Sequence, residues 1–86
     1  MRIGLGYAQL DTSEIYRAFG RGVRIVRKQK RIRQTDIARS AGLSPATISN
    51  IEHGNPNASI ASVVAIARYL ETTIGKLIRI GLEAKD

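Results

Sequence analysis

The chain has 86 residues, enough for one small domain whose modest core leaves it either marginally stable or dependent on a partner subunit. It contains no cysteine and one histidine, so disulfides and thiolate metal sites are excluded, a zinc centre has almost no ligands, and we expect no cofactor. The formal net charge is +7, and the absence of paired acids at helical spacing in an apolar setting argues against an enzyme.

Residues 1–12 are predicted to form an N-terminal arm. Ile3, Leu5 and Tyr7 alternate with Gly4 and Gly6, a spacing typical of a strand but too rich in glycine to be stable by itself. The segment has neither the long apolar core nor the cleavage-like site of a signal peptide. Because no apolar run in the chain is long enough to span a bilayer, we expect a soluble cytoplasmic protein.

The first helix is predicted to follow the arm and to end near residue 29 or 30. Glu14 falls in its first turn, where an acid is favourable. Gly20 and Gly22 lie inside the pattern and each cost roughly 1 kcal/mol relative to alanine, so we expect a helix that is irregular or begins near Phe19. The candidate caps are Asp11, Thr12 and Ser13, and the apolar side carries Ile15, Phe19, Val23 and Val26.

Positive charge is concentrated between Arg17 and Arg39, where nine lysines and arginines accompany a single acid, Asp36. The rest of the chain is close to neutral, which indicates one basic face rather than charge spread for solubility. Cations that step by four or three residues form a stripe away from the apolar side of the helix, suited to a phosphate backbone. This stripe consists of Arg17, Arg21, Arg24, Lys28 and Arg31.

Residues 34–54 have the pattern of two short helices, Gln34–Ala41 and Pro45–Glu52, around a three-residue turn. Gly42 supplies the left-handed backbone that ends a helix, Ser44 can cap the next helix, and Pro45 suits its first turn. Helices joined this tightly must cross steeply, as in a helix-turn-helix motif. Small or amide-bearing side chains, which suit insertion into a DNA major groove, occupy the exposed positions of the second helix: Ala46, Thr47, Ser49 and Asn50.

Two more helices are predicted after a loop rich in turn formers at residues 53–58, the first capped by Ser59 and the second beginning at Thr73. The fourth helix is expected to face the core with Ile60, Val63, Val64, Ile66, Ala67 and Leu70. The fifth carries an apolar stripe that so small a core cannot wholly absorb, which predicts a dimer interface of Ile74, Leu77, Ile78 and Leu82. The domain is then predicted at 13–82 and a C-terminal tail at 83–86.

Several motifs between about Phe19 and Ile78 together resemble the Cro/cI-type, or XRE-type, family of bacterial and phage DNA-binding domains. They are Arg27, Gln34, Ile37-Ala38, Gly42-Leu43-Ser44, Ala46-Thr47-Ile48-Ser49, Ile51-Glu52 and Gly54, followed by the helix from Ser59 to Leu70. The resemblance implies an all-α, five-helix, lambda-repressor-like domain with its helix-turn-helix at helices two and three. The segment ATISN and the Asn-Pro-rich loop after it are also similar to HipB-type antitoxins, which repress their own operons and bind a toxin.

The resemblance also assigns roles to individual residues. It implies that Gln34 hydrogen-bonds a phosphate while its amide braces the third helix, and that Arg27 forms an ion pair with Glu52. An acid at the end of the third helix is badly placed for DNA unless a cation neutralises it. Arg31 stands where the family usually has a helix-ending glycine, so we expect a left-handed residue there. Arg33 replaces a capping threonine or asparagine, which removes a cap worth about 1 kcal/mol.

The candidate DNA contacts divide into two groups. Base contacts are expected from Ala46, Thr47, Ser49 and Asn50, of which Asn50 can pair with N6 and N7 of adenine. The alternatives stay open that Asn50 is merely an exposed polar residue, that Thr47 caps its helix or contacts phosphate, and that Asn57 shapes its loop. Phosphate contacts are expected from Arg24, Lys28, Arg31, Arg33, Gln34, His53, Asn55 and Asn57.

These features predict a sequence-specific regulator of transcription that binds double-stranded DNA as a homodimer and represses from a pseudo-palindromic operator. A single recognition helix reads only a few base pairs, and two copies square the discrimination. One alternative is an antitoxin that represses its own operon and binds a toxin protein, which an adjacent toxin gene would favour. The other is a basic module that binds nucleic acid without sequence preference, which equal affinity for random and operator DNA would favour.

Overall fold

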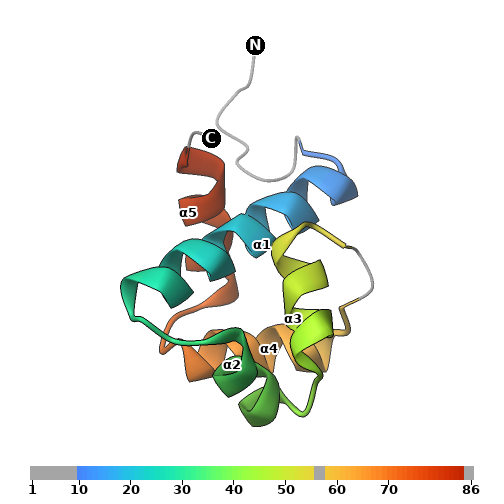
Figure 1. Cartoon of the computed structure of the whole chain (residues 1–86). Coiled ribbons are helices and arrows are strands. Elements are labelled where there is room, and N and C mark those ends of the chain that lie inside the picture. The colour runs from blue at the N-terminus through green and yellow to red at the C-terminus, as the bar shows by residue number, and fades with distance from the viewer. Residues whose placement is uncertain (1–9, 56–57, 85–86) are drawn as a thin grey trace.

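The computed structural model describes residues 10–55 and 58–84, which fold as five helices around one core. The helices are α1 (Thr12–Gln29), α2 (Gln34–Ala41), α3 (Pro45–Glu52), α4 (Ile60–Tyr69) and α5 (Ile74–Glu83). In Figure 1, α1 crosses α5, while α2, α3 and α4 lie together below α1. The described part of the chain contains no strand, and the predicted all-α, five-helix architecture is confirmed.

The helix boundaries agree closely with the local sequence signals. Both α2 and α3 begin and end at the predicted residues. Helix α1 begins at Thr12 and α5 ends at Glu83, each one residue outside the predicted domain limits. Residues 1–9 of the predicted arm, residues 85–86 of the predicted tail and Asn57 lie outside the described residues, so the division into arm, domain and tail stays a prediction.

Side-chain caps explain why four of these helices begin where they do. Asp11 accepts a hydrogen bond from the Glu14 amide at 2.8 Å, and the Glu14 carboxylate accepts one from the Asp11 amide at 2.9 Å. The hydrogen bond from the Glu14 amide, together with one from the Ser13 hydroxyl, holds the pKa of Asp11 below its usual 3.8. The remaining capped helices, α3, α4 and α5, are capped by Ser44, Ser59 and Thr73.

Helix α1 is continuous through both of its glycines, so the expectation of an irregular or late-starting helix is wrong. A Cβ atom on Gly20 would collide with the Ile51 carbonyl of α3, and one on Gly22 would collide with the Leu77 carbonyl of α5. The glycines therefore let α1 lie directly against two other helix backbones. Tertiary packing offsets their low helix propensity, which local sequence alone does not reveal.

The core lies between the five helices, with α1 packed on α5 and α3, and α2 packed on α3 and α4. It is aliphatic apart from Phe19 of α1, and partly buried Ile15, Ile32, Leu43 and Val63 extend it toward the surface. The largest side chains that are completely buried are Val23, Ile37, Ile48, Ile66, Leu70 and Leu77. Each helix contributes one of these residues, and Leu70, the C-cap of α4, adds a further one. The five helices therefore share a single core.

The apolar stripe of α5 is largely consumed by this core, which contradicts the expectation that it remains free for a dimer. Leu77 is 0% exposed and Ile78 is 9% exposed, while Ile74 is half-buried and Leu82 is 40% exposed. The backbone contact between α1 and α5 is the physical reason, since Gly81 lies so close to the Ala18 carbonyl that no Cβ would fit there. Leu77 is a core residue without exposed surface, whereas Ile78 is buried but also lines an apolar surface cleft together with Ile74.

One predicted core position of α4 is also wrong. Ile60, the first residue of α4, is 79% exposed, whereas Ile66, Ala67 and Leu70 are buried as expected and Val63 and Val64 are half-buried. The helical spacing alone grouped Ile60 with them, but Ile60 lines an open apolar cleft on the surface, together with Ile15 and Ile74.

Candidate nucleic-acid interface

The turn between α2 and α3 has the geometry that its three residues predict. Gly42 ends α2 with φ 70°, in the left-handed region where a Cβ is unfavourable. The Leu43 amide then donates to the Ala38 carbonyl at 2.8 Å, and Ser44 accepts from the Thr47 amide at 3.1 Å. Because Ala38 is buried and small, the two helices can cross closely at this point.

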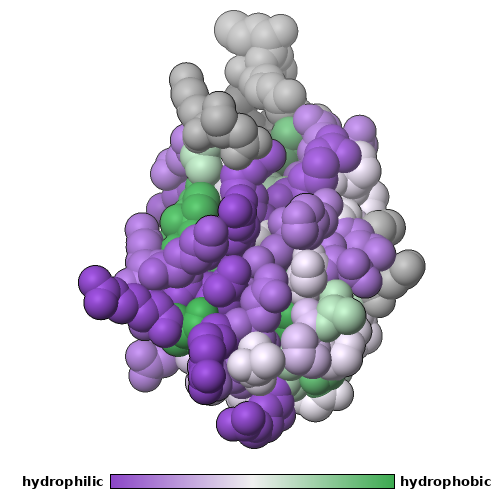
Figure 2. All heavy atoms as spheres, in the orientation of Figure 1, coloured by the Kyte–Doolittle hydropathy of each residue, from purple (hydrophilic) through white to green (hydrophobic). Residues whose placement is uncertain are grey.

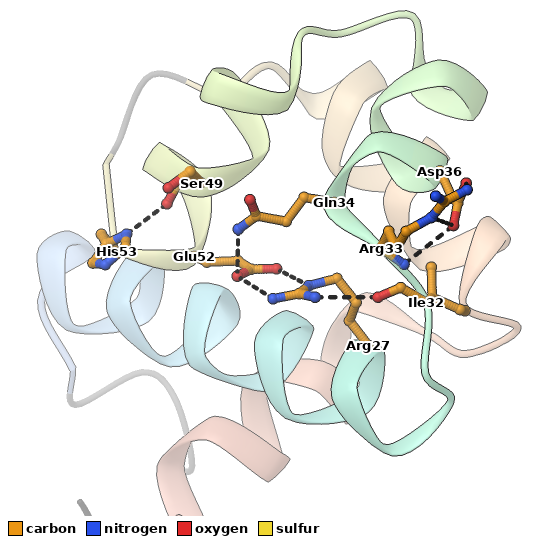
Figure 3. Close-up of polar contacts among 8 residues, drawn as sticks. All are labelled: Arg27, Ile32, Arg33, Gln34, Asp36, Ser49, Glu52 and His53. Atoms are coloured by element: carbon orange, nitrogen blue, oxygen red, sulfur yellow. Dashed lines mark hydrogen bonds and ion pairs between the residues drawn. The ribbon is translucent and has the colours of Figure 1, made fainter.

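Glu52, at the end of α3, is neutralised inside the protein, and the ion pair with Arg27 is present (Figure 3). Arg27 donates from Nε to Glu52 Oε2 at 2.6 Å and from Nη2 to Oε1 at 3.1 Å, and its Nη1 donates to the Ile32 carbonyl at 3.1 Å. Gln34 Nε2 also donates to Glu52 Oε1, at 3.1 Å. One carboxylate, only 2% exposed, thereby joins α1, α2 and α3.

Gln34 thus braces α3 as the resemblance implied. Its amide nitrogen carries two protons, and one hydrogen bond to Glu52 uses one of them. The second proton is the donor that a phosphate oxygen, which can only accept, would require. The phosphate contact of Gln34 itself stays a proposal.

The four candidate base-contacting residues of α3 differ in how exposed they are. Ala46 and Asn50 are exposed, while Thr47 and Ser49 are half-buried. The Thr47 hydroxyl lies 2.9 Å from the Ser44 hydroxyl, so it already has a hydrogen-bond partner at the start of the helix. Asn50 is therefore the exposed residue of α3 with an amide able to read a base edge.

His53, which follows α3, is held in one tautomer by its neighbour. Its Nδ1 lies 2.7 Å from the Ser49 carbonyl oxygen, which can only accept, so Nδ1 carries a proton and donates (Figure 3). In the neutral ring Nε2 is then an acceptor and offers nothing to a phosphate oxygen. The phosphate contact of His53 stays a proposal.

Two adjoining clefts lined with cations run beside α3. One, of about 490 Å³, lies between α1 and the end of α3 and is lined by Arg17, Arg21, Arg24, Glu52 and His53. The other, of about 700 Å³, shares Arg24, Glu52 and His53 and continues past Arg27, Lys28, Arg33 and Gln34 to Thr35 and Pro45, at the beginnings of α2 and α3. Figure 2 shows this side of the molecule as mostly hydrophilic, with small apolar areas between. Together the clefts make a basic channel along α1.

Seven of the eight predicted phosphate residues, all but Asn57, lie in the described part of the chain and fall into three groups. Arg24, Lys28, Arg33, Gln34 and His53 line the basic channel. Asn55 lies apart from it, in a cleft of about 260 Å³ beside Thr47 and Asn50, and its side chain is half-buried. Arg31 is exposed and has φ 58°, which confirms the left-handed residue expected at the end of α1.

Three residues in or beside the channel were not named among the individual phosphate or base contacts expected from the sequence. Arg17 and Arg21 line it, with the Arg17 stem against Gly54 and Arg21 Nη1 donating to the Gly81 carbonyl at 3.0 Å. Both belong to the stripe of cations in the sequence, which was the available signal. Asp36 is the third, and its position three residues after Arg33 was the signal that it caps α2.

Neither a membrane span nor a metal cluster is found in the described ranges. Within residues 10–55 and 58–84, no helix is long and apolar enough to cross a bilayer. The same residues contain no group of three or more histidine, aspartate or glutamate side chains placed to hold a metal ion.

Comparison with known proteins finds a matching family model and a similar regulator. Residues 23–77 match a family model described as helix-turn-helix. The chain is also 38% identical over 52 residues to an uncharacterized HTH-type transcriptional regulator of Sinorhizobium fredii, y4mF, with 60% of this chain and 68% of that protein covered. The family match begins within α1 and ends within α5, so it includes the turn, both of its helices and the ion pair of Arg27 with Glu52, which joins α1 to α3.

Proposed function

Because the chain belongs to the XRE-type, or Cro/cI-type, helix-turn-helix family of DNA-binding regulators, we propose that it is a homodimeric repressor that binds a pseudo-palindromic operator. In this proposal α3 enters the major groove and Asn50, with Ala46, Thr47 and Ser49 beside it, faces base edges. The observation that carries the proposal is the exposure of Asn50 and Ala46 on a helix flanked by a basic channel.

The electrostatics of α3 support the same orientation. An acid at the end of a recognition helix would repel the phosphate backbone, but Glu52 is buried against Arg27 and presents no free charge. The cations of the channel, among them Arg24, Lys28 and Arg33, are proposed to bind backbone phosphates on the flank of the groove. Backbone contacts position the protein, and α3 supplies the discrimination between bases.

The homodimer is proposed from what recognition of a DNA sequence requires, and not from an interface seen in the structure. One helix reads about three or four base pairs, which is too few for a unique site, whereas a two-fold dimer reads two such half-sites. Of the four predicted interface residues, Ile74 and Leu82 remain accessible from outside the core. We propose these two as the α5 residues that a second copy reaches.

Selection of bound sequences from a pool of random duplexes tests the proposed function. We expect two inverted half-sites whose centres lie about 10 base pairs, or a multiple of that spacing, apart. A single unrepeated half-site would contradict the dimer, and recovery of sequences without any preference would favour the alternative of a non-specific basic module.

A further inference from the structure

Helix α2 begins with a residue that cannot cap it. Arg33 occupies the N-cap position, and its guanidinium has only hydrogen-bond donors. Asp36, one turn later, supplies the missing acceptor by taking a hydrogen bond from the Arg33 amide at 3.2 Å. Half of the capping arrangement is thereby restored from inside the helix.

The same carboxylate also holds the Arg33 side chain (Figure 3). Arg33 Nε donates to Asp36 Oδ2 and Nη2 donates to Oδ1, both at 3.3 Å, so the guanidinium meets two carboxylate oxygens side by side. These side-chain hydrogen bonds are the main reason that the pKa of Asp36 lies below its usual 3.8, and the group is ionised at neutral pH. A phosphate offers a guanidinium the same pair of adjacent, negatively charged oxygens.

The two partners differ in how freely they can separate. The Arg33 side chain is 77% exposed and the Asp36 side chain is 24% exposed. The Asp36 carboxylate is anchored to the start of α2 by the Arg33 amide, whereas the guanidinium is at the end of a long chain that lines the basic channel. Arg33 can therefore leave Asp36 for another anion without undoing the cap.

We propose that Asp36 is an internal competitor for DNA phosphate: it occupies the Arg33 guanidinium in the free protein, and a backbone phosphate displaces it on binding. The inference rests on the proposed DNA-binding function and assigns a regulating residue to it. Asp36 thus lowers the affinity that Arg33 would otherwise add. Because exposed ion pairs are weak, the competition corresponds to an affinity change of up to about fivefold.

A double-mutant cycle tests the competition, with Asp36→Asn, Arg33→Gln and the double variant compared with wild type. Asparagine keeps an oxygen for the Arg33 amide but removes the competing charge. Each variant is titrated with one random-sequence duplex and with the selected operator, at fixed salt. We expect Asp36→Asn to tighten binding to both duplexes by about two- to fivefold where Arg33 is present, and by clearly less where Arg33 is replaced by glutamine.

The cycle separates competition from simple repulsion. If Asp36 only repels the DNA backbone through space, Asp36→Asn will tighten binding equally in both backgrounds, and that result overturns the inference while leaving the proposed function intact. Weaker or unchanged binding by folded Asp36→Asn overturns it as well. A wild-type protein that binds neither duplex overturns the proposed function and this inference with it.

Two measurements on the free protein complete the test. Thermal unfolding must show that every variant is folded. In Arg33→Gln the pKa of the Asp36 carboxyl, titrated by NMR, should rise toward its usual value, because the largest cause of the lowering is then absent. An unchanged titration would mean that Arg33 is not held by Asp36 in solution and would overturn the inference.

Discussion

Arg27 clamps the Glu52 carboxylate with two hydrogen bonds, at 2.6 and 3.1 Å, across the junction of α1 and α3. Arg27→Met leaves the carboxylate buried with Gln34 as its remaining side-chain donor, and breaking a buried pair in this way costs about 3–5 kcal/mol. We therefore expect a large drop in the free energy of unfolding, or loss of the folded state, measured by urea denaturation.

The exposed pair of Lys30 with Glu71, 3.6 Å apart, is the matched control. Lys30→Met removes a cation from the end of α1 but leaves no buried charge, so its effect on the free energy of unfolding should stay below about 1 kcal/mol. Similar effects of the two substitutions would mean that Glu52 is not held as a buried, paired charge.

Arg31 exchanges stability for positive charge. Its φ of 58° costs a residue with a Cβ roughly 1–2 kcal/mol, which glycine does not incur. Arg31→Gly should raise the free energy of unfolding by about 1 kcal/mol. If Arg31 also contacts a phosphate, the same substitution should weaken DNA binding and reduce the slope of log affinity against log salt by about 0.9.

Glu71 has the same φ of 58° as Arg31 and carries no positive charge, so it is the control for the Arg31 substitution. Glu71→Gly should stabilise the fold by a similar amount without weakening DNA binding, because it removes an acid rather than a cation. If Glu71→Gly lowered the affinity for DNA as much as Arg31→Gly does, both losses would come from a change of the backbone at the helix ends and not from a lost phosphate contact.

Leu77 and Ile78 are predicted to be essential for folding rather than for dimer formation. Replacing both by aspartate places unpaired charges inside the core, since Leu77 is completely buried. Circular dichroism should show loss of helix. Leu82→Asp, at an exposed position, should remain helical, and its sedimentation reports on the dimer. Folded, helical monomers of the double aspartate variant would restore the stripe of α5 as an interface.

Gly20 is expected to be intolerant of even one methyl group. Gly20→Ala pushes α1 away from the Ile51 carbonyl of α3, and overpacking of this kind costs about 1–3 kcal/mol. A methyl group added at Gly75, in the first turn of α5, would meet no atom within 4 Å, so Gly75→Ala should be neutral or stabilising by up to about 1 kcal/mol. Thermal unfolding of the two variants distinguishes these effects. If Gly20→Ala were as stable as Gly75→Ala, α1 and α3 would be packed less closely than the structure shows.

Local signals were sufficient to predict α2 and α3. Gly42, Ser44 and Pro45 act within one turn of the chain, so their effect on the backbone is visible in the sequence itself. The ion pair of Arg27 with Glu52 was accessible only through the family resemblance, because the two residues are 25 positions apart.

The features that sequence reasoning missed depend on contacts between distant segments. Helix α1 is continuous because α3 lies against Gly20 and α5 lies against Gly22. Leu77 is buried because α5 packs this closely on α1. Helical periodicity identifies an apolar side but does not say which surface covers it. Asp36 was missed for a different reason, since a cap is expected from the N-cap residue itself rather than from its partner one turn later.

Whether α3 reads bases from the major groove is decided by Asn50→Ala, titrated with operator and with random duplex over a range of salt. Loss of an amide that pairs with a base should cost about 1–3 kcal/mol on the operator alone and relax the preference at one base position in each half-site. Lys28→Ala is the comparison, since loss of a phosphate contact should weaken both duplexes and lower the salt slope by about 0.9. If Asn50→Ala weakens both duplexes equally and changes the salt slope, Asn50 contacts the backbone and α3 does not read bases as proposed.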